Sequence, residues 1–130
     1  MNKKILVTGA FFGVLGIILG AFASHGLKEL ITIEAQQSFE TGVRYQMYHA
    51  FLLLLIGSTT ILEEKPKKTI FILLVMGVFL FSGSIYGLST NELTAFNFKS
   101  IALITPIGGL LLILGWLIML INLLKMKGDN

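Results

Sequence analysis

The chain has 130 residues, of which 55% are hydrophobic and only 13% are charged, and its formal net charge is +3. A soluble domain of this size cannot bury so much apolar surface, so the composition predicts an integral membrane protein. The chain contains no cysteine, which excludes disulfides and thiolate metal sites. Its ten lysines and arginines lie at the ends of apolar segments instead of in one patch, so their charge does not indicate a nucleic-acid partner.

Four apolar stretches are long enough to cross a hydrocarbon core about 30 Å thick as helices, which takes roughly 20 residues. They cover residues 5–23, 45–62, 69–88 and 101–124. None of them alternates polar and apolar residues as membrane β-strands do. The sequence therefore predicts an all-α membrane protein, one domain over residues 1–130 with four transmembrane helices.

The first stretch also has features of a secretory signal, because Lys3 and Lys4 precede an apolar run that ends in Ala21, Phe22 and Ala23. That run is longer than the 7 to about 15 apolar residues that are usual in such signals. Its length favours an uncleaved transmembrane helix.

The basic residues predict the orientation in the membrane. With four spans both termini lie on one side, and that side holds seven lysines: Lys3, Lys4, Lys65, Lys67, Lys68, Lys125 and Lys127. The other side holds Lys28, Arg44 and Lys99. Cytoplasmic loops carry the excess of lysine and arginine, so both termini are expected in the cytoplasm.

The segment between the first two spans is expected to be an amphipathic helix. Its apolar residues recur near helical spacing with charged residues between them, and they include Leu27, Ile31, Ala35 and Phe39. Such a segment is expected to lie on the outer membrane surface, with a bend at Gly42. Alternatively, its second half continues directly into the second span.

The first span carries a row of glycines. Gly9, Gly13, Gly16 and Gly20 are spaced by four, three and four residues, which places them on one helix face. Membrane helices associate where small residues let their backbones approach. The row therefore predicts helix packing, either inside one molecule or against a second copy or another membrane protein.

Polar residues gather in the outer part of the predicted bundle. We interpret eight of them as a candidate ligand-binding cluster: His25, Arg44, Tyr45, Tyr48, His49, Ser82, Tyr86 and Thr105. His49 lies about one turn inside its span, where a polar side chain needs a partner, and Ser82 and Tyr86 are the expected partners. The alternative is that the tyrosines form an interfacial belt, Arg44 anchors a helix end, and His49 is structural.

The sequence contains no signature of catalysis or of cofactor binding. Two histidines without cysteine, and no carboxylate inside any span, provide neither a zinc site nor a carboxylate-oriented triad in the membrane. No phosphate-binding or dinucleotide-binding glycine motif is present. We therefore expect no enzyme activity, no metal and no cofactor.

Four blocks of the sequence resemble a known family. Residues 20–28, 41–50, 80–86 and 104–109 are similar, in that order, to the signature blocks of the YgdD/YwdK-like family of small bacterial inner-membrane proteins. The resemblance covers nearly the whole chain. It implies a multi-pass protein of the bacterial plasma membrane, and the family, a domain of unknown function, carries no activity or site residue over to this chain.

Two functions remain open from the sequence. In the first, the outer polar cluster binds a lipid head group or small amphiphile, with positive charge from His25, Lys28 and Arg44. In the second, the chain is a structural or accessory membrane protein whose glycine faces pack against a homo-oligomer partner or another protein. The lipid bilayer is the one partner that both share.

Overall fold

The computed structural model describes residues 2–93 and 102–128, and over these residues the chain is entirely helical outside its turns. In chain order these residues form four long helices and two short 3-10 helices: α1 (Asn2–Ser24), η1 (Leu27–Glu29), α2 (Ile33–Ser58), α3 (Glu64–Ser89), η2 (Asn91–Leu93) and α4 (Ile104–Leu124). The all-α prediction is confirmed. Lys99 and position 101, used in the topology and span predictions, lie outside the described residues.

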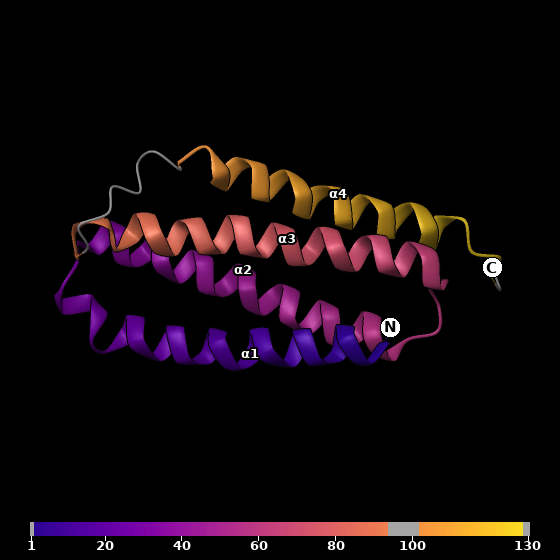
Figure 1. Cartoon of the computed structure of the whole chain (residues 1–130), viewed down its shortest axis with the longest axis horizontal. Coiled ribbons are helices and arrows are strands. Elements are labelled where there is room, and N and C mark those ends of the chain that lie inside the picture. The colour runs from indigo at the N-terminus through magenta and orange to yellow at the C-terminus, as the bar shows by residue number, and fades with distance from the viewer. Residues whose placement is uncertain (1, 94–101, 129–130) are drawn as a thin grey trace.

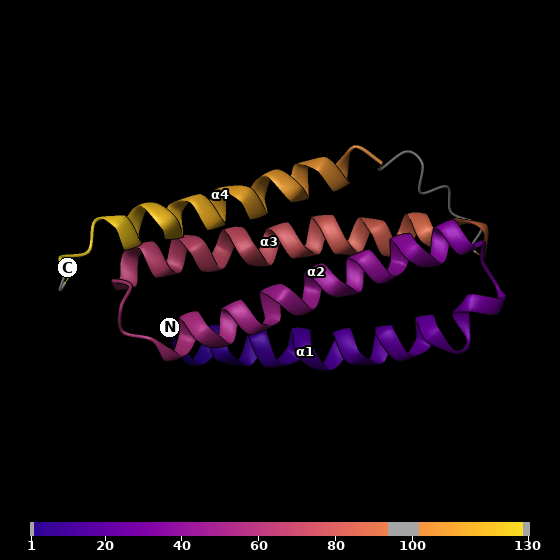
Figure 2. The ribbon, with the colours of Figure 1, turned by 180° about the vertical axis from the view of Figure 1, so that it is seen from behind.

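The four long helices lie side by side in a row, as Figures 1 and 2 show from opposite sides. Each helix packs antiparallel against its neighbour in sequence, and α1 and α4 occupy opposite edges. The chain's two ends lie at the same end of the row, which we call the termini end. The opposite end, called the distal end, holds η1, the start of α2, the end of α3 and the start of α4.

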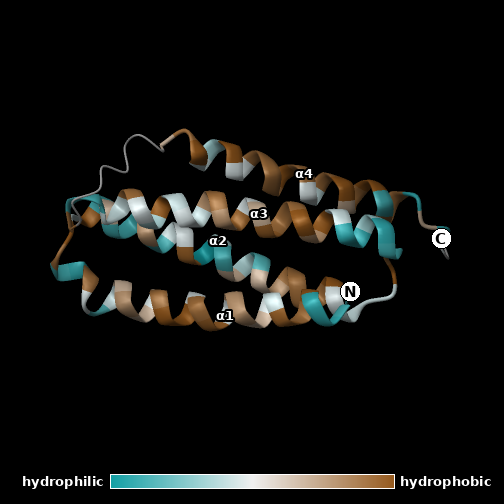
Figure 3. Cartoon of the chain, in the orientation of Figure 1, coloured by the Kyte–Doolittle hydropathy of each residue, from teal (hydrophilic) through white to brown (hydrophobic). Residues whose placement is uncertain are grey.

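In the part of the chain that the structure describes, three segments are long and apolar enough to cross a membrane: Asn2–Glu29, Glu64–Ser89 and Ile104–Leu124. Figure 3 shows hydrophobic residues through the middle of α1, α3 and α4, whereas the middle of α2 includes hydrophilic positions. Arg44, Gln46 and His49 lower the apolar character of α2, although its 26 residues give it ample length. Composition alone thus supports three of the four predicted spans.

The segment before the second span is part of α2 itself. Thr32 caps this helix by accepting a hydrogen bond from the backbone N–H of Ala35, and the helix then runs without a break to Ser58. The predicted bend at Gly42 is wrong, because the helix is unbroken there. The Gly42 backbone packs against Ile85 and Tyr86 of α3, and its carbonyl accepts a hydrogen bond from Ser82. The alternative, a continuous helix, is the one that forms.

Small residues set the distance between neighbouring helices. An added Cβ at Gly9 would lie 3.0 Å from the Ala50 carbonyl oxygen, and one at Gly16 would overlap Met47, so both glycines allow α1 to approach α2 closely. A Cβ at Gly108 of α4 would overlap the backbone of Leu80 and Phe81 in α3.

The predicted glycine face of α1 is only partly used in this packing. A Cβ added at Gly20 would make an ordinary contact with Val43, and one added at Gly13 would have no described atom of another residue within 4 Å. At about 100° per residue, Gly13 and Gly16 lie some 60° apart around the helix, so a straight partner such as α2 covers one and leaves the other open.

The termini end contains a buried lysine. Lys67 in the first turns of α3 is 1% exposed, and its Nζ donates hydrogen bonds to the Thr59 carbonyl at 2.7 Å and to Oδ1 of Asn2 at 3.2 Å. Oε1 of Glu64 lies 3.8 Å away. Lys67 therefore connects the start of α1 to the turn between α2 and α3.

Candidate functional site

A buried glutamine joins three helices at the centre of the polar cluster. Gln46 of α2 is 5% exposed; its Nε2 donates to the Phe12 carbonyl of α1 at 2.9 Å, and its Oε1 accepts from the Tyr86 hydroxyl of α3 at 2.6 Å. A helix carbonyl such as that of Phe12 accepts this second bond with its free lone pair. Both ends of the amide are therefore satisfied by protein.

Ser82 forms a second link between α2 and α3. Its hydroxyl is buried and donates to the Gly42 carbonyl at 2.7 Å. The Tyr86 ring, one turn further along α3, lies 4.8 Å from the ring of Phe39 on α2. Ser82 and Tyr86 thus face α2, as predicted, but each bonds to a group other than His49.

His49 is buried, at 3% exposed, and both of its ring nitrogens have partners. Its Nε2 accepts a hydrogen bond from the indole Nε1 of Trp116 on α4 at 3.0 Å, and its Nδ1 lies 2.6 Å from the Tyr45 carbonyl. An indole N–H can only donate, so Nε2 carries no proton and Nδ1–H donates to the carbonyl. The expectation that Ser82 or Tyr86 pairs with His49 is wrong; the partner is Trp116.

The other predicted cluster residues lie on the surface or between α3 and α4. His25, Arg44, Tyr45 and Tyr48 are exposed, and Arg44 donates to the hydroxyl of Thr41 on its own helix. The ring of Tyr45 packs against Phe81 and Tyr48. Thr105 of α4 bonds to the hydroxyl of Ser84, which itself donates to the Phe81 carbonyl, so Thr105 is the donor.

The structure therefore divides the predicted cluster instead of gathering it around one ligand. Its buried members are satisfied by protein groups, which is the arrangement expected of residues that hold helices together. The sequence reading did not single out Gln46 or Trp116. The sequence could have indicated both as members of a hydrogen-bonded cluster, because an amide and an indole N–H within an apolar helix each require a partner.

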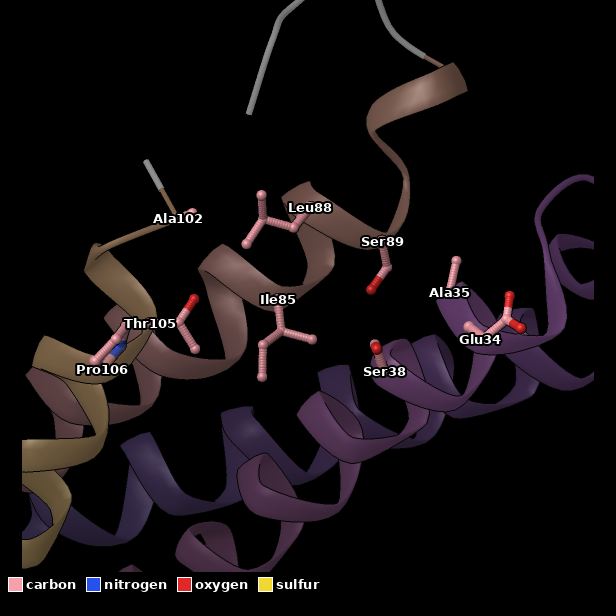
Figure 4. Close-up of a pocket in the computed structure, with 9 residues that line it drawn as sticks. All are labelled: Glu34, Ala35, Ser38, Ile85, Leu88, Ser89, Ala102, Thr105 and Pro106. Carbon is pink, nitrogen blue, oxygen red and sulfur yellow. The ribbon is translucent and has the colours of Figure 1, made fainter. Parts of the chain in front are cut away.

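A cavity of about 490 Å³ opens at the distal end between α2, α3 and α4 (Figure 4). We call it the distal cavity, and nine residues line it: Glu34, Ala35, Ser38, Ile85, Leu88, Ser89, Ala102, Thr105 and Pro106. Of the eight predicted ligand residues, all of which the structure describes, Thr105 alone is in this lining.

Ser89 in the distal cavity has an unused hydroxyl. The residue is 8% exposed, and its buried Oγ has no hydrogen-bond partner among the residues that the structure describes. Figure 4 shows its side chain directed from α3 toward α2. A buried hydroxyl without a partner costs about 1–3 kcal/mol, so a bound polar group would stabilise it.

A second, smaller cavity adjoins the first. Its volume is about 160 Å³, it shares Ala35, Leu88 and Ser89 with the distal cavity, and we call it the side cavity. It is also lined by Ile31, Thr32, Asn91 and Glu92. Ser89 therefore stands in the wall between two spaces, each of which has a glutamate in its lining.

Within residues 2–93 and 102–128, no three histidine or acidic side chains come together in a way that could hold a metal ion. The chemistry available at the distal cavity is hydrogen bonding by hydroxyl groups, the negative charge of the Glu34 carboxylate, and apolar contact with Ile85, Leu88 and Pro106. These are features of a binding site for a molecule with a polar end and an apolar part.

A family described as "Protein of unknown function (DUF423)" matches residues 19–109 of the chain. The matched region runs from the end of α1 to the first turns of α4. It includes Gln46, His49 and Ser89 but ends before Trp116. No solved structure matches the chain significantly.

Relatives of similar length cover nearly the whole chain. The UPF0382 membrane protein of Haemophilus influenzae is 34% identical over 98% of this chain and 98% of its own length. The UPF0382 membrane protein YwdK of Bacillus subtilis is 34% identical over 95% of this chain and 98% of its own. The UPF0382 inner membrane protein YgdD of Escherichia coli is 29% identical over 97% and 93%.

Proposed function

We propose that this chain, which belongs to the DUF423 family of membrane proteins of unknown function, binds a lipid head group or small amphiphile in the distal cavity. UPF0382 proteins such as YwdK and YgdD represent this family. Membership confirms the resemblance that the four sequence blocks indicated. The proposed role is binding, with no catalytic step, and it belongs to a four-span protein of the bacterial plasma membrane.

The proposal that α2 is the fourth span is supported by its length and by its hydrogen bonds. Its 26 residues extend about 39 Å, more than the hydrocarbon thickness of about 30 Å. Gln46 and His49 face other helices and are satisfied there, so neither presents an unpaired polar group to lipid. Its antiparallel packing between α1 and α3 also places it along the same axis as two apolar helices.

The orientation that we propose puts the termini end in the cytoplasm. The seven lysines of the larger basic set belong to that end, whereas Lys28 and Arg44 belong to the distal half. The positive-inside rule then supports an outward-facing distal end. In this arrangement the distal cavity opens at the level of the outer leaflet.

The observation that carries the binding function is the Ser89 hydroxyl in the wall of the distal cavity, which is buried and has no partner within residues 2–93 and 102–128. Elsewhere in the cluster, Gln46, His49 and Ser82 have protein partners. Ile85, Leu88 and Pro106 supply an apolar wall beside the hydroxyl. This combination suits an amphiphile whose polar end reaches Ser89 while its chain contacts the apolar residues.

Native mass spectrometry of the protein released from lipid nanodiscs tests this proposal. We expect the wild-type protein to retain a lipid or amphiphile and the variant Ala35→Phe, which fills the distal cavity, to retain less. Ala10→Phe on the exposed surface of α1 is the matched control, because it adds the same side chain away from the cavity. A wild-type protein without bound lipid, or equal retention in both variants, contradicts the proposal.

A second candidate function is that of an accessory protein that packs against a further copy or another membrane protein. It is favoured by Gly13, the one glycine of the α1 row with open space above it. Phe11 and Val14 beside it are exposed, so this part of α1 offers a small notch among apolar side chains. Close approach of a second helix at such a notch is the usual role of small residues in membranes.

A further inference from the structure

We propose that the ligand of the distal cavity carries a positively charged amine head group. This inference rests on the proposed binding function and specifies its chemistry. It begins with the glutamates on the two sides of Ser89: Glu34 in the lining of the distal cavity and Glu92 in the lining of the side cavity. None of the described lining residues of either cavity is lysine, arginine or histidine.

The Ser89 hydroxyl adds an uncharged polar group in the lining shared by both cavities. An ammonium group has N–H donors and no acceptor, so it can donate both to a hydroxyl oxygen and to carboxylate oxygens. Ser89 is also the last residue of α3, where the helix dipole places partial negative charge. The carboxylates and the C-terminus of α3 therefore both favour a cation, and the Ser89 hydroxyl can accept one of its hydrogen bonds.

One feature of the distal cavity favours an anion instead. The start of α4, with Ala102, Thr105 and Pro106, forms the opposite wall, and a helix N-terminus carries about half a positive charge. Pro106 has no backbone N–H to offer, and the Thr105 hydroxyl proton is already donated to Ser84. The full charge of Glu34 in the distal cavity, with that of Glu92 in the adjoining side cavity, thus exceeds one partial charge with few free donors.

Glu34 also has a simple structural role, because an acidic residue in the first turn stabilises a helix such as α2. That role does not account for Glu92 or for the Ser89 hydroxyl, which has no partner among the described residues. An amine ligand accounts for Glu34, Glu92 and the Ser89 hydroxyl together. The apolar wall of Ile85, Leu88 and Pro106 then receives the carbon chain that follows the head group.

The test uses the full-length protein in nanodiscs with equal amounts of phosphatidylethanolamine and phosphatidylglycerol. The two lipids share the anionic phosphate and differ in the group attached to it, a cationic amine in the first and an uncharged glycerol in the second. Native mass spectrometry counts the retained lipids of each kind. We expect phosphatidylethanolamine to be enriched, and each of Glu34→Gln and Glu92→Gln to lower that enrichment by roughly 2- to 5-fold, as for partly exposed charge pairs. Ser89→Ala should lower total retention.

Glu29→Gln is the matched control, because Glu29 is an exposed carboxylate near the same end of the molecule but outside both linings. Added ethanolamine distinguishes the two sources of an amine: displacement of the lipid indicates that the head group alone is recognised, and no displacement indicates a lipid with its chain. Enrichment of phosphatidylglycerol, or an effect of Glu29→Gln equal to that of Glu34→Gln, overturns the amine inference and leaves amphiphile binding intact. If no lipid of either kind is retained, the proposed function itself fails.

Discussion

The indole of Trp116 on α4 donates a hydrogen bond of 3.0 Å to Nε2 of His49 on α2, although α3 separates these two helices in the row. The ring centroids are 6.1 Å apart with the planes nearly perpendicular. The contact therefore connects two helices that are not neighbours. It also fixes which nitrogen of the imidazole carries the proton.

We predict that Trp116→Phe lowers the free energy of unfolding by about 1–3 kcal/mol, because the buried Nε2 of His49 loses its donor. His49→Leu should cost a similar amount. Because the two residues share one bond, the double variant should be less destabilised than the sum of the single ones. Unfolding in detergent measures all three, and additive effects would show that the bond does not couple the residues.

Replacing Gln46 by Leu should also destabilise the protein, because it leaves the Tyr86 hydroxyl without an acceptor and removes the bond to the Phe12 carbonyl. We expect a loss of about 1–3 kcal/mol for the hydroxyl that becomes unpaired. Adding Tyr86→Phe to Gln46→Leu should recover part of the loss, since it removes the unpaired group. A double variant less stable than Gln46→Leu would contradict this account.

The contact of α3 with α4 predicts opposite behaviour for two glycines. Gly108→Ala should destabilise the protein by about 1–3 kcal/mol, because the new Cβ would overlap the backbone of Leu80 and Phe81 and force the helices apart. Gly83→Ala has nothing within 4 Å of its new Cβ and should leave stability unchanged or slightly higher. Thermal unfolding in detergent compares the two variants. Equal effects would show that the close backbone approach of α3 and α4 at Gly108 does not determine stability.

On α1 the same reasoning separates packing within one molecule from packing between molecules. Gly16→Leu should lower the unfolding temperature, because the larger side chain meets Gln46 and Met47. Gly13→Leu should not lower it, but if the accessory function holds, this variant should lose any oligomer seen in nanodiscs. Loss of stability in Gly13→Leu without a change of oligomeric state would refute that function.

The orientation predicts the accessibility of single cysteines in whole cells, for which the absence of native cysteine is convenient. A cysteine at Gln37, exposed in the distal part of α2, should react with an impermeant maleimide. One at Lys65, exposed at the termini end, should react only after the cells are opened. Lys67 is unsuitable because it is buried. The reverse pattern would invert the topology.

Much of the architecture follows from the sequence alone. Apolar length predicts where α1, α3 and α4 lie, because a helix must contain enough apolar residues to replace water by lipid. The glycine spacing predicts close helix contacts, and the depth of His49 predicts that it needs a protein partner. Each of these conclusions depends on one helix and the solvent around it.

The identity of the partners depends on several helices at once and was decided only by the tertiary structure. Residue spacing places Ser82, Tyr86 and His49 on helix faces, but it does not say which face of α2 meets α3 and which side chain reaches α4. The packing of the row pairs Tyr86 with Gln46 and His49 with Trp116, leaves Gly13 uncovered, and leaves Ser89 without a partner among the described residues. A polar residue in an apolar helix therefore predicts that a hydrogen-bond partner exists, whereas the geometry of the neighbouring helices determines which group that partner is.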